Sequence, residues 1–155
     1  MVFDAANEIP VFYSANMSLG INVLIKALKE ITGVLEENFN IEIIEKHHTK
    51  KADSPSGTAL LLADTINDAC QVKKEYLYGR HSKNDACQMT DLGIHAVRSG
   101  TIAGEHTVIF GGPDEVIELK HLALSRNIFA TGALKAAKFL AGKGKGMYSM
   151  EELIK

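Results

Sequence analysis

The middle of the chain contains, in close succession, a strand pattern, two adjacent histidines and a helix start. The isoleucine-rich segment Asn40–Glu45 is expected to form a β-strand, because β-branched side chains favour strands. Ser54 is expected to cap a helix that begins at Pro55, since proline suits the first helical position. The side chains in between then lie at the carboxyl end of a strand, where α/β sheets bind ligands.

The first turn of this helix is expected to bind an anion. Ser56, Gly57 and Thr58 fall within it, where backbone N–H groups lack intrahelical partners and the helix dipole is positive. Gly57 would also let a ligand approach the backbone closely. By itself, Ser-Pro-Ser-Gly-Thr more often marks a capped helix behind a solvated basic loop. The histidine pair and Lys51 just before it favour a site for a carboxylate or phosphate instead.

The basic side chains have different expected roles. His47 and His48 are neighbours, so on an extended strand they point in opposite directions, and one could face a reacting centre while the other faces a carboxylate. Lys51 is the best candidate for a proton donor, because positive surroundings favour the loss of its proton. Lys50 is expected to be a solvated charge, and Arg126 could bind an anion through its guanidinium fork.

Two other kinds of chemistry are disfavoured. The cysteines and the other histidines show no metal-ligand spacing, so no metal site is predicted, and a zinc-dependent hydrolase that uses His47 and His48 is kept only as a distant alternative. Ser56 lacks the GxSxG elbow of a serine nucleophile. Histidines inside strand patterns are expected to be hydrogen-bonded or interfacial, namely His95, His106 and His121.

Length and composition indicate one globular domain. The chain has 155 residues, of which 46% are hydrophobic and 23% charged, enough for a core without disulfide or metal staples. The net charge of −2 gives no electrostatic reason to expect nucleic acid or an acidic membrane as a partner. The two cysteines lack CxxC spacing, and neither a signal peptide nor an apolar run of about 20 residues is present. A cytoplasmic location is therefore expected.

Hydrophobic periodicity predicts the other elements. Residues 18–37 and 127–140 are expected to be helices, while residues 71–92 give no readable pattern. Gly111–Asp114 is a hairpin signal, so the strands around it are expected to be antiparallel. Both faces of these strands carry apolar side chains, which predicts helices on one face and a partner subunit on the other. The strands are expected at Ile9–Tyr13, largely buried, and at residues 94–98, 106–110 and 116–121.

Several stretches resemble one enzyme family. Glu45–His48, Lys51 and Asp53–Leu60 closely resemble the signature of the dihydrodipicolinate reductase (4-hydroxy-tetrahydrodipicolinate reductase) family. Further similar stretches are Ala15–Asn22, Arg98–Thr107, and His121–Arg126 with Phe129–Ala130 and Gly132–Ala133. The resemblance covers nearly the whole chain in order.

The resemblance implies a reaction and a set of site residues. Such a reductase moves hydride from NADH or NADPH onto a cyclic dicarboxylated imine, formed by loss of water from 4-hydroxy-tetrahydrodipicolinate, in lysine and diaminopimelate biosynthesis. His47 and Lys51 would be the catalytic pair, with Lys51 as the proton donor. Asn16 and Met17 would lie at the nicotinamide, where many members have Phe in place of Met17, and Arg126 near the cofactor. The substrate carboxylate would be held by His48, Lys51, Ser56, Gly57 and Thr58.

The resemblance also implies an architecture. The expected fold is α/β (α+β), an open mixed sheet of about four strands with helices on one face and a homotetramer interface on the other. Residues 1–17 would be a remnant of a dinucleotide-binding domain with its hinge, residues 18–126 the substrate-binding and oligomerisation domain, and residues 127–155 a C-terminal helix returning toward the dinucleotide-binding domain.

The glycine-rich turn of the family's dinucleotide-binding domain does not occur in this sequence. The chain is therefore expected to be the substrate-binding part, either a truncated piece or one product of a larger gene, with little or no reductase activity of its own. The alternative is a dicarboxylate-binding and assembly module that catalyses nothing.

Overall fold

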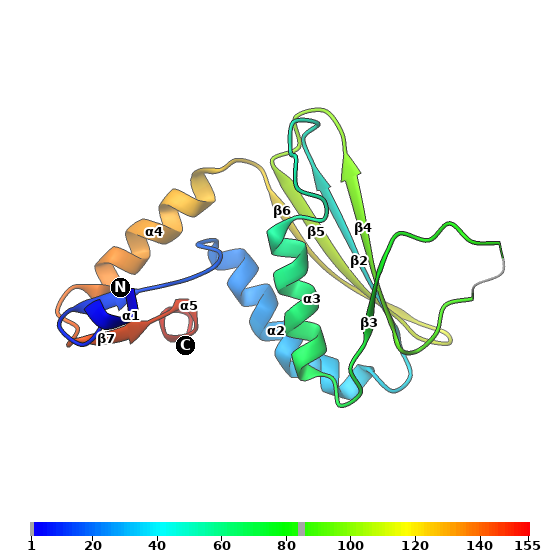
Figure 1. Ribbon diagram of the computed structural model, residues 1–155, viewed down its shortest axis with the longest axis horizontal. Coiled ribbons are helices and arrows are strands. Elements are labelled where there is room, and N and C mark those ends of the chain that lie inside the picture. Colours follow the sequence, from blue (N-terminus) through cyan, green and yellow to red (C-terminus); the bar gives the residue numbers. More distant parts are fainter. Residues whose placement is uncertain (1, 84–85) are drawn as a thin grey trace. The chain divides into compact units, whose positions relative to one another are not determined.

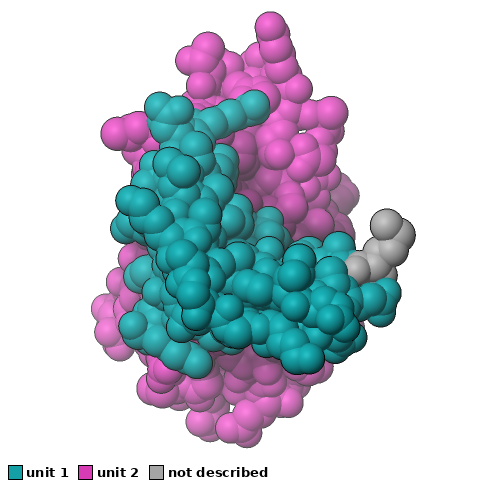
Figure 2. Space-filling model, turned by 90° about the vertical axis from the view of Figure 1, so that its left-hand side faces the viewer, with its two compact units in different colours: residues 1–26, 125–155 teal, residues 27–124 magenta. Residues whose placement is uncertain are grey.

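The computed structural model describes residues 2–83 and 86–155 (Figure 1). They form two compact units, each described by itself (Figure 2). The terminal unit comprises residues up to 26 together with residues 125–155, and the central unit comprises residues 27–124. The sequence-based division into segments 1–17, 18–126 and 127–155 assigns functional roles, whereas these two units are defined by contacts. The functional division stays a prediction.

A mixed five-stranded sheet forms the framework of the central unit. β2 pairs in parallel with β4 and antiparallel with β5. β3 runs parallel to β4, and β6 runs antiparallel to β5. The predicted α/β class with a mixed sheet is confirmed. The strand order is β3 (Glu75–Tyr78), β4 (Asp91–Arg98), β2 (Asn40–His47), β5 (Gly104–Gly111) and β6 (Val116–Ala123).

One detail of the sheet differs from the sequence-based expectation of about four strands. The fifth strand, β3, lies inside the stretch 71–92 that gave no readable pattern, because four residues are too few to show a period. β2 lies between β4 and the hairpin strand β5. The hairpin itself is confirmed, and the Gly112 N–H donates to the Glu115 carbonyl at 2.9 Å.

One face of the sheet is covered by α3 (Gly57–Ala69) and by the central-unit part of α2 (Leu19–Leu35), as expected (Figure 1). Along β2 the inward row begins with Ile41 and Ile43 and then changes to Glu45 and His47, all of them buried. The sheet face is therefore apolar in the middle and polar at the carboxyl end of β2. Core residues exposed by 2% or less include Ile41, Ile43, Leu62, Ile66, Leu92, Ile94, Val108 and Phe110.

Helix α3 begins two residues later than predicted. Its N-cap is Ser56, whose Oγ accepts a hydrogen bond from the Ala59 N–H at 3.2 Å, so the expectation of Ser54 as cap and Pro55 as first helical residue was wrong. The Ser54–Pro55 peptide bond is cis, and the Ser56 N–H donates to the Glu45 carboxylate outside the helix. Both serines fit the sequence rule for a cap, and only this tertiary contact selects the second.

The terminal unit is small and partly aromatic. β1 and β7 pair in parallel, and β1 is half-buried rather than largely buried as expected. The Phe139 ring contacts Phe12 and Tyr148 edge to face, with centroids 6.3 and 5.9 Å apart. Its elements are α1 (Val2–Ala5), β1 (Pro10–Phe12), the first part of α2, α4 (Asn127–Leu140), β7 (Gly146–Tyr148) and α5 (Met150–Leu153).

Gly132 lets α4 approach the turn before α2. A Cβ at this position would overlap the backbone carbonyl oxygen of Met17. Backbone cannot move aside as the end of a flexible side chain can, so this close approach requires glycine.

We therefore expect Gly132→Ala to lower the free energy of unfolding by about 1–3 kcal/mol, the usual cost of overpacking. Gly33→Ala is the matched control, because Gly33 also lies in a helix but a Cβ there meets only the Ala69 carbonyl oxygen at 3.7 Å. That control should be neutral or stabilising. Urea unfolding of the two variants measures the difference, and equal stability of Gly132→Ala and the wild type would contradict the close packing.

Candidate functional site

A buried carboxylate lies at the carboxyl end of β2. The Glu45 side chain is fully buried, and each of its oxygens accepts two hydrogen bonds. Oε1 accepts from the Ser56 N–H at 2.9 Å and from Arg98 Nη2 at 2.7 Å. Oε2 accepts from Arg98 Nη1 at 2.7 Å and lies 2.6 Å from His47 Nδ1. Glu45 thus joins β2, β4 and the start of α3.

These contacts keep Glu45 ionised. Burial by itself would raise the pKa of Glu45, but the hydrogen bonds from Arg98, His47 and Ser56 outweigh it and lower that pKa below its usual value. The pKa of Arg98 is raised in turn, chiefly by its hydrogen bonds to Glu45. The pair is therefore an ion pair at neutral pH.

His47 ends β2 and is almost fully buried. Its ring lies edge to face against His106, with centroids 5.1 Å apart. A Cβ on Gly104 would come within 3.2 Å of His47 Nε2, so this glycine leaves space beside the ring. His48, one residue later, is half-buried, and the two imidazoles therefore have different surroundings.

His106 lies between His47 and the helix cap. Its Nε2 is 3.0 Å from Ser56 Oγ, and its side chain is buried. Burial, followed by the neighbouring His47, lowers the pKa of His106 to about 4. His106 is therefore neutral at physiological pH, and it supports the serine without adding charge to the site.

The start of α3 offers the features that an anion needs. Gly57 and Thr58 are in the first turn as expected, whereas Ser56 is the cap. A Cβ on Gly57 would meet no atom within 4 Å, so the backbone faces open space there. The positive end of the helix dipole favours a negative charge at such a position, and a hydrogen bond from the Gly57 backbone already adds to that from Lys51 in lowering the pKa of Asp53.

Lys51 has a carboxylate close by. Its Nζ lies 2.8 Å from Asp53 Oδ1, and this hydrogen bond is the main cause that lowers the pKa of Asp53. The sequence-based expectation of positive surroundings for Lys51 did not include this carboxylate. Arg98 Nη2 donates to the Asp53 carbonyl at 2.6 Å, which ties this loop to Glu45.

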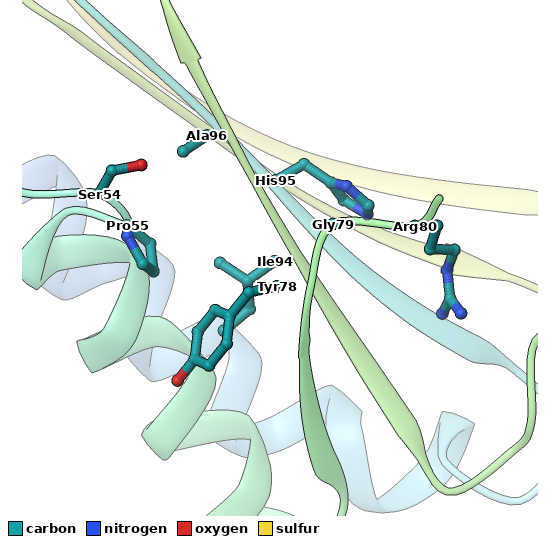
Figure 3. Close-up of a pocket in the computed structure, with 8 residues that line it drawn as sticks. All are labelled: Ser54, Pro55, Tyr78, Gly79, Arg80, Ile94, His95 and Ala96. Atoms are coloured by element: carbon teal, nitrogen blue, oxygen red, sulfur yellow. The ribbon is translucent and has the colours of Figure 1, made fainter. Parts of the chain in front are cut away.

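A separate pocket of about 750 Å³ lies beside the site (Figure 3). It is bounded by Ser54 and Pro55 before α3, by the residues that follow β3, and by β4. Its basic side chains already have partners, since Arg80 contacts Glu42 and Asp91, and His95 contacts Glu42. None of the residues predicted to bind or react lines this pocket, so we do not assign the site to it.

Residues 20–154 match the family described as "Dihydrodipicolinate reductase, C-terminus". This chain belongs to that family. A protein of Caldanaerobacter subterraneus subsp. tengcongensis named 4-hydroxy-tetrahydrodipicolinate reductase is 59% identical over 154 residues, covering 99% of this chain and 61% of the relative. A protein of the same name from Clostridium tetani is 56% identical, covering 97% of this chain and 59% of the relative. The chain thus spans about three fifths of the length of these relatives.

A solved structure shares the fold of this reductase-family chain. It is described as "Dipicolinate bound Dihydrodipicolinate reductase from Paenisporosarcina sp. TG-14" and superposes with a TM-score of 0.75 at 23% sequence identity. The alignment covers 95% of this chain and 56% of that one. The arrangement of strands and helices is therefore that of a dihydrodipicolinate reductase.

The three residues expected at the cofactor all lie in the terminal unit of this reductase-family chain. The Asn16 side chain accepts from the Ser18 N–H at 2.8 Å, and the Asn16 carbonyl accepts from Asn22 Nδ2 at 2.8 Å. Met17 follows in the same turn, and Arg126 precedes the first residue of α4. The residues around Glu45 belong to the central unit, so a shared ligand for both groups stays a prediction.

Four participants were missed as site residues by reasoning from the sequence. Glu45 and Arg98 were assigned there only to predicted strands and to stretches that resemble the family, Gly104 only to such a stretch, and His106 was interpreted as a hydrogen-bonded or interfacial histidine. The cross-strand register that sets Glu45 opposite His106 brings this group together. The signal available in the sequence was Glu45, a charged residue at a position of β2 where the alternation of side chains predicts an inward-facing one.

Among the described residues no group of three or more His, Cys, Asp or Glu side chains could hold a metal ion. No helix in the described part of the chain is both long and apolar enough to cross a membrane.

The buried His106 makes stability depend on pH. Its pKa is about 4 in the folded chain against an ordinary 6.5, so between these values the unfolded chain binds a proton that the folded chain does not. The free energy of unfolding therefore falls as the pH drops through this window, by about 2 kcal/mol between about pH 7 and about pH 5.

His106→Gln should remove this contribution. Burial lowers the pKa of His121 as well, so some slope of the same sign is expected to remain. Urea unfolding of wild type and variant at the two pH values gives the comparison, and identical slopes would show that His106 does not titrate in this way.

Proposed function

We propose that this chain is the substrate-binding part of a 4-hydroxy-tetrahydrodipicolinate reductase, which uses NADH or NADPH to reduce the cyclic imine formed from its substrate by loss of water, in lysine and diaminopimelate biosynthesis. The observation that carries this proposal is the Glu45 carboxylate, which binds both His47 and the Ser56 N–H. The imidazole and the helix N-terminus are thereby parts of one site. The names of the relatives supply the reaction.

A dicarboxylate suits the geometry at α3. One carboxylate of the ligand would take the place of Asp53 at the Gly57 N–H and would accept further hydrogen bonds from the Thr58 N–H and the Ser56 hydroxyl. His48 and Lys51 would add positive charge to the same carboxylate. The solved relative that shares the fold is described as dipicolinate bound, which supports this class of ligand.

The reduction requires hydride at a carbon of the C=C bond that is conjugated with the imine, and a proton that balances the electron pair moved toward the ring nitrogen. Reduced nicotinamide, when bound, would supply the hydride. Lys51 would donate the proton from Nζ, and the nearby Asp53 carboxylate would hold that ammonium on the loop. His47, with Nε2 beside Gly104, would orient the ring and stabilise charge as the proton moves.

The cofactor contacts proposed for this chain are limited to Asn16, Met17 and Arg126. The Asn16–Met17 turn is held by side-chain hydrogen bonds and by the close approach of Gly132, so it could present a fixed surface to a nicotinamide. The described residues contain no glycine-rich turn between a strand and a helix, which is the usual cradle for a pyrophosphate. The expected cytoplasmic location stays a prediction.

The uncovered face of the sheet supports a proposed homotetramer. Val97 and Leu122 are 41% and 48% exposed there, and they surround an ion-pair group in which Glu105 binds Lys46 and Lys120. In Figure 1 the helices of the central unit lie on the opposite face. Apolar side chains around paired charges suit an interface between copies of the chain.

Dicarboxylate binding is the first test. Isothermal titration with pyridine-2,6-dicarboxylate, a planar mimic of the product, is expected to show binding by the wild-type chain. The double variant His48→Ala, Lys51→Ala should lose affinity by about tenfold or more, because two cationic groups leave the carboxylate site. Lys50→Ala, next to Lys51, is the matched control and should bind normally. A folded wild-type chain that does not bind would contradict a site formed within these residues.

The second candidate function is a dicarboxylate-binding and assembly module without activity of its own. It is favoured by a site that has an anion-binding helix start but no pyrophosphate cradle among the described residues.

Enzymes typically turn over at roughly 1–10³ per second. We expect the 155-residue chain alone to oxidise NADH or NADPH in the presence of substrate far more slowly than that. A steady-state absorbance assay measures this rate. A rate within the typical range would contradict the hypothesis of an inactive binding module and would support that of a reductase.

A further inference from the structure

The Glu45 carboxylate has all of its accepting positions filled. Two donors contact each oxygen, and they come from His47, Ser56 and both terminal nitrogens of Arg98. A carboxylate can accept about four hydrogen bonds, so none of its capacity is left over. A buried charge requires such complete hydrogen bonding, because it has lost its contacts with water.

This arrangement determines the protonation pattern of His47. An ionised carboxylate can only accept, so His47 Nδ1, 2.6 Å from Glu45 Oε2, must carry a hydrogen. In the neutral ring the remaining nitrogen, Nε2, then has a free lone pair. That nitrogen lies beside Gly104, where a Cβ would come to 3.2 Å from it.

We propose that Glu45 is a positioning residue that holds His47 in the Nδ1–H form and presents its Nε2 to the ligand. The same carboxylate accepts a hydrogen bond from the Ser56 N–H, so it also sets the distance between the imidazole and the first turn of α3. Arg98 extends the link, because its guanidinium binds the carbonyl of Asp53, the ion-pair partner of Lys51. The identity of the ligand rests on the proposed function, whereas the protonation pattern of the ring does not.

A purely structural role does not account for this geometry. A buried ion pair is seldom more stabilising than well-packed apolar residues of similar volume. The rest of the inward row of β2 is apolar, and its Ile41 and Ile43 are fully buried without polar partners. The row becomes charged only where it reaches His47 and the helix start.

Nitrogen NMR of the histidine rings tests the proposal on this chain without any ligand. A long-range proton–nitrogen correlation spectrum distinguishes a ring nitrogen that carries hydrogen from one that does not. His47→Gln assigns the signals, and a pH titration identifies the neutral form. In the wild type we expect neutral His47 to carry its hydrogen on Nδ1.

Glu45→Gln should change this pattern. The glutamine amide can donate to Nδ1, so a substantial fraction of the ring is expected to move to the Nε2–H form. Glu105→Gln is the matched control, because Glu105 is also a buried, doubly paired carboxylate but binds Lys46 of β2 and Lys120 of β6. It should leave the His47 signals unchanged.

The wild-type spectrum can overturn the proposal by itself, if neutral His47 carries its hydrogen on Nε2. An unchanged pattern in folded Glu45→Gln would overturn it as well. If the single variant does not fold, Glu45→Gln combined with Arg98→Gln removes both buried charges and allows the same comparison. Absence of dicarboxylate binding would reject the proposed function and would leave this spectrum as an independent result.

Discussion

The ion pair between Glu45 and Arg98 joins the parts of the candidate site. Removing each charge from water costs several kcal/mol, so the pair persists only because every hydrogen-bonding position of the carboxylate is used. Loss of either partner would leave the other charge buried, which typically costs about 3–5 kcal/mol. The imidazole of His47, the start of α3 and the loop of Lys51 therefore depend on one interaction, although they come from different elements.

The positive charge of the candidate site comes from groups other than the buried His106. His47 and His106 lie ring against ring, and burial together with that neighbour keeps His106 neutral. The ammonium of Lys51 and the positive end of α3 then provide the cationic character of the site, and Asp53 balances part of it. Such a site is suited to an anion that brings its own charge, because the helix dipole at the start of α3 and the ammonium of Lys51 both attract negative charge.

The sequence predicts those features that are local. The helix of residues 19–35, the hairpin after β5 and the position of Gly57 and Thr58 in the first turn of α3 follow from spacing and turn signals within a few residues. The four-residue β3 is too short to show a period, and the choice of Ser56 over Ser54 as cap depends on a bond to β2. The partnership of Glu45 with Arg98 spans 53 residues and arises from strand register, which hydrophobic patterns do not encode.

The central place of β2 in the sheet has a consequence for motion. β2 is hydrogen-bonded along both edges, to β4 and to β5, so its backbone amides should exchange with solvent only when the whole unit opens. His47 is the last residue of that strand, whereas Lys51 lies on the loop beyond it. One half of the site is thus attached to the most protected part of the fold, and the other half can adjust on a faster timescale to whatever is bound.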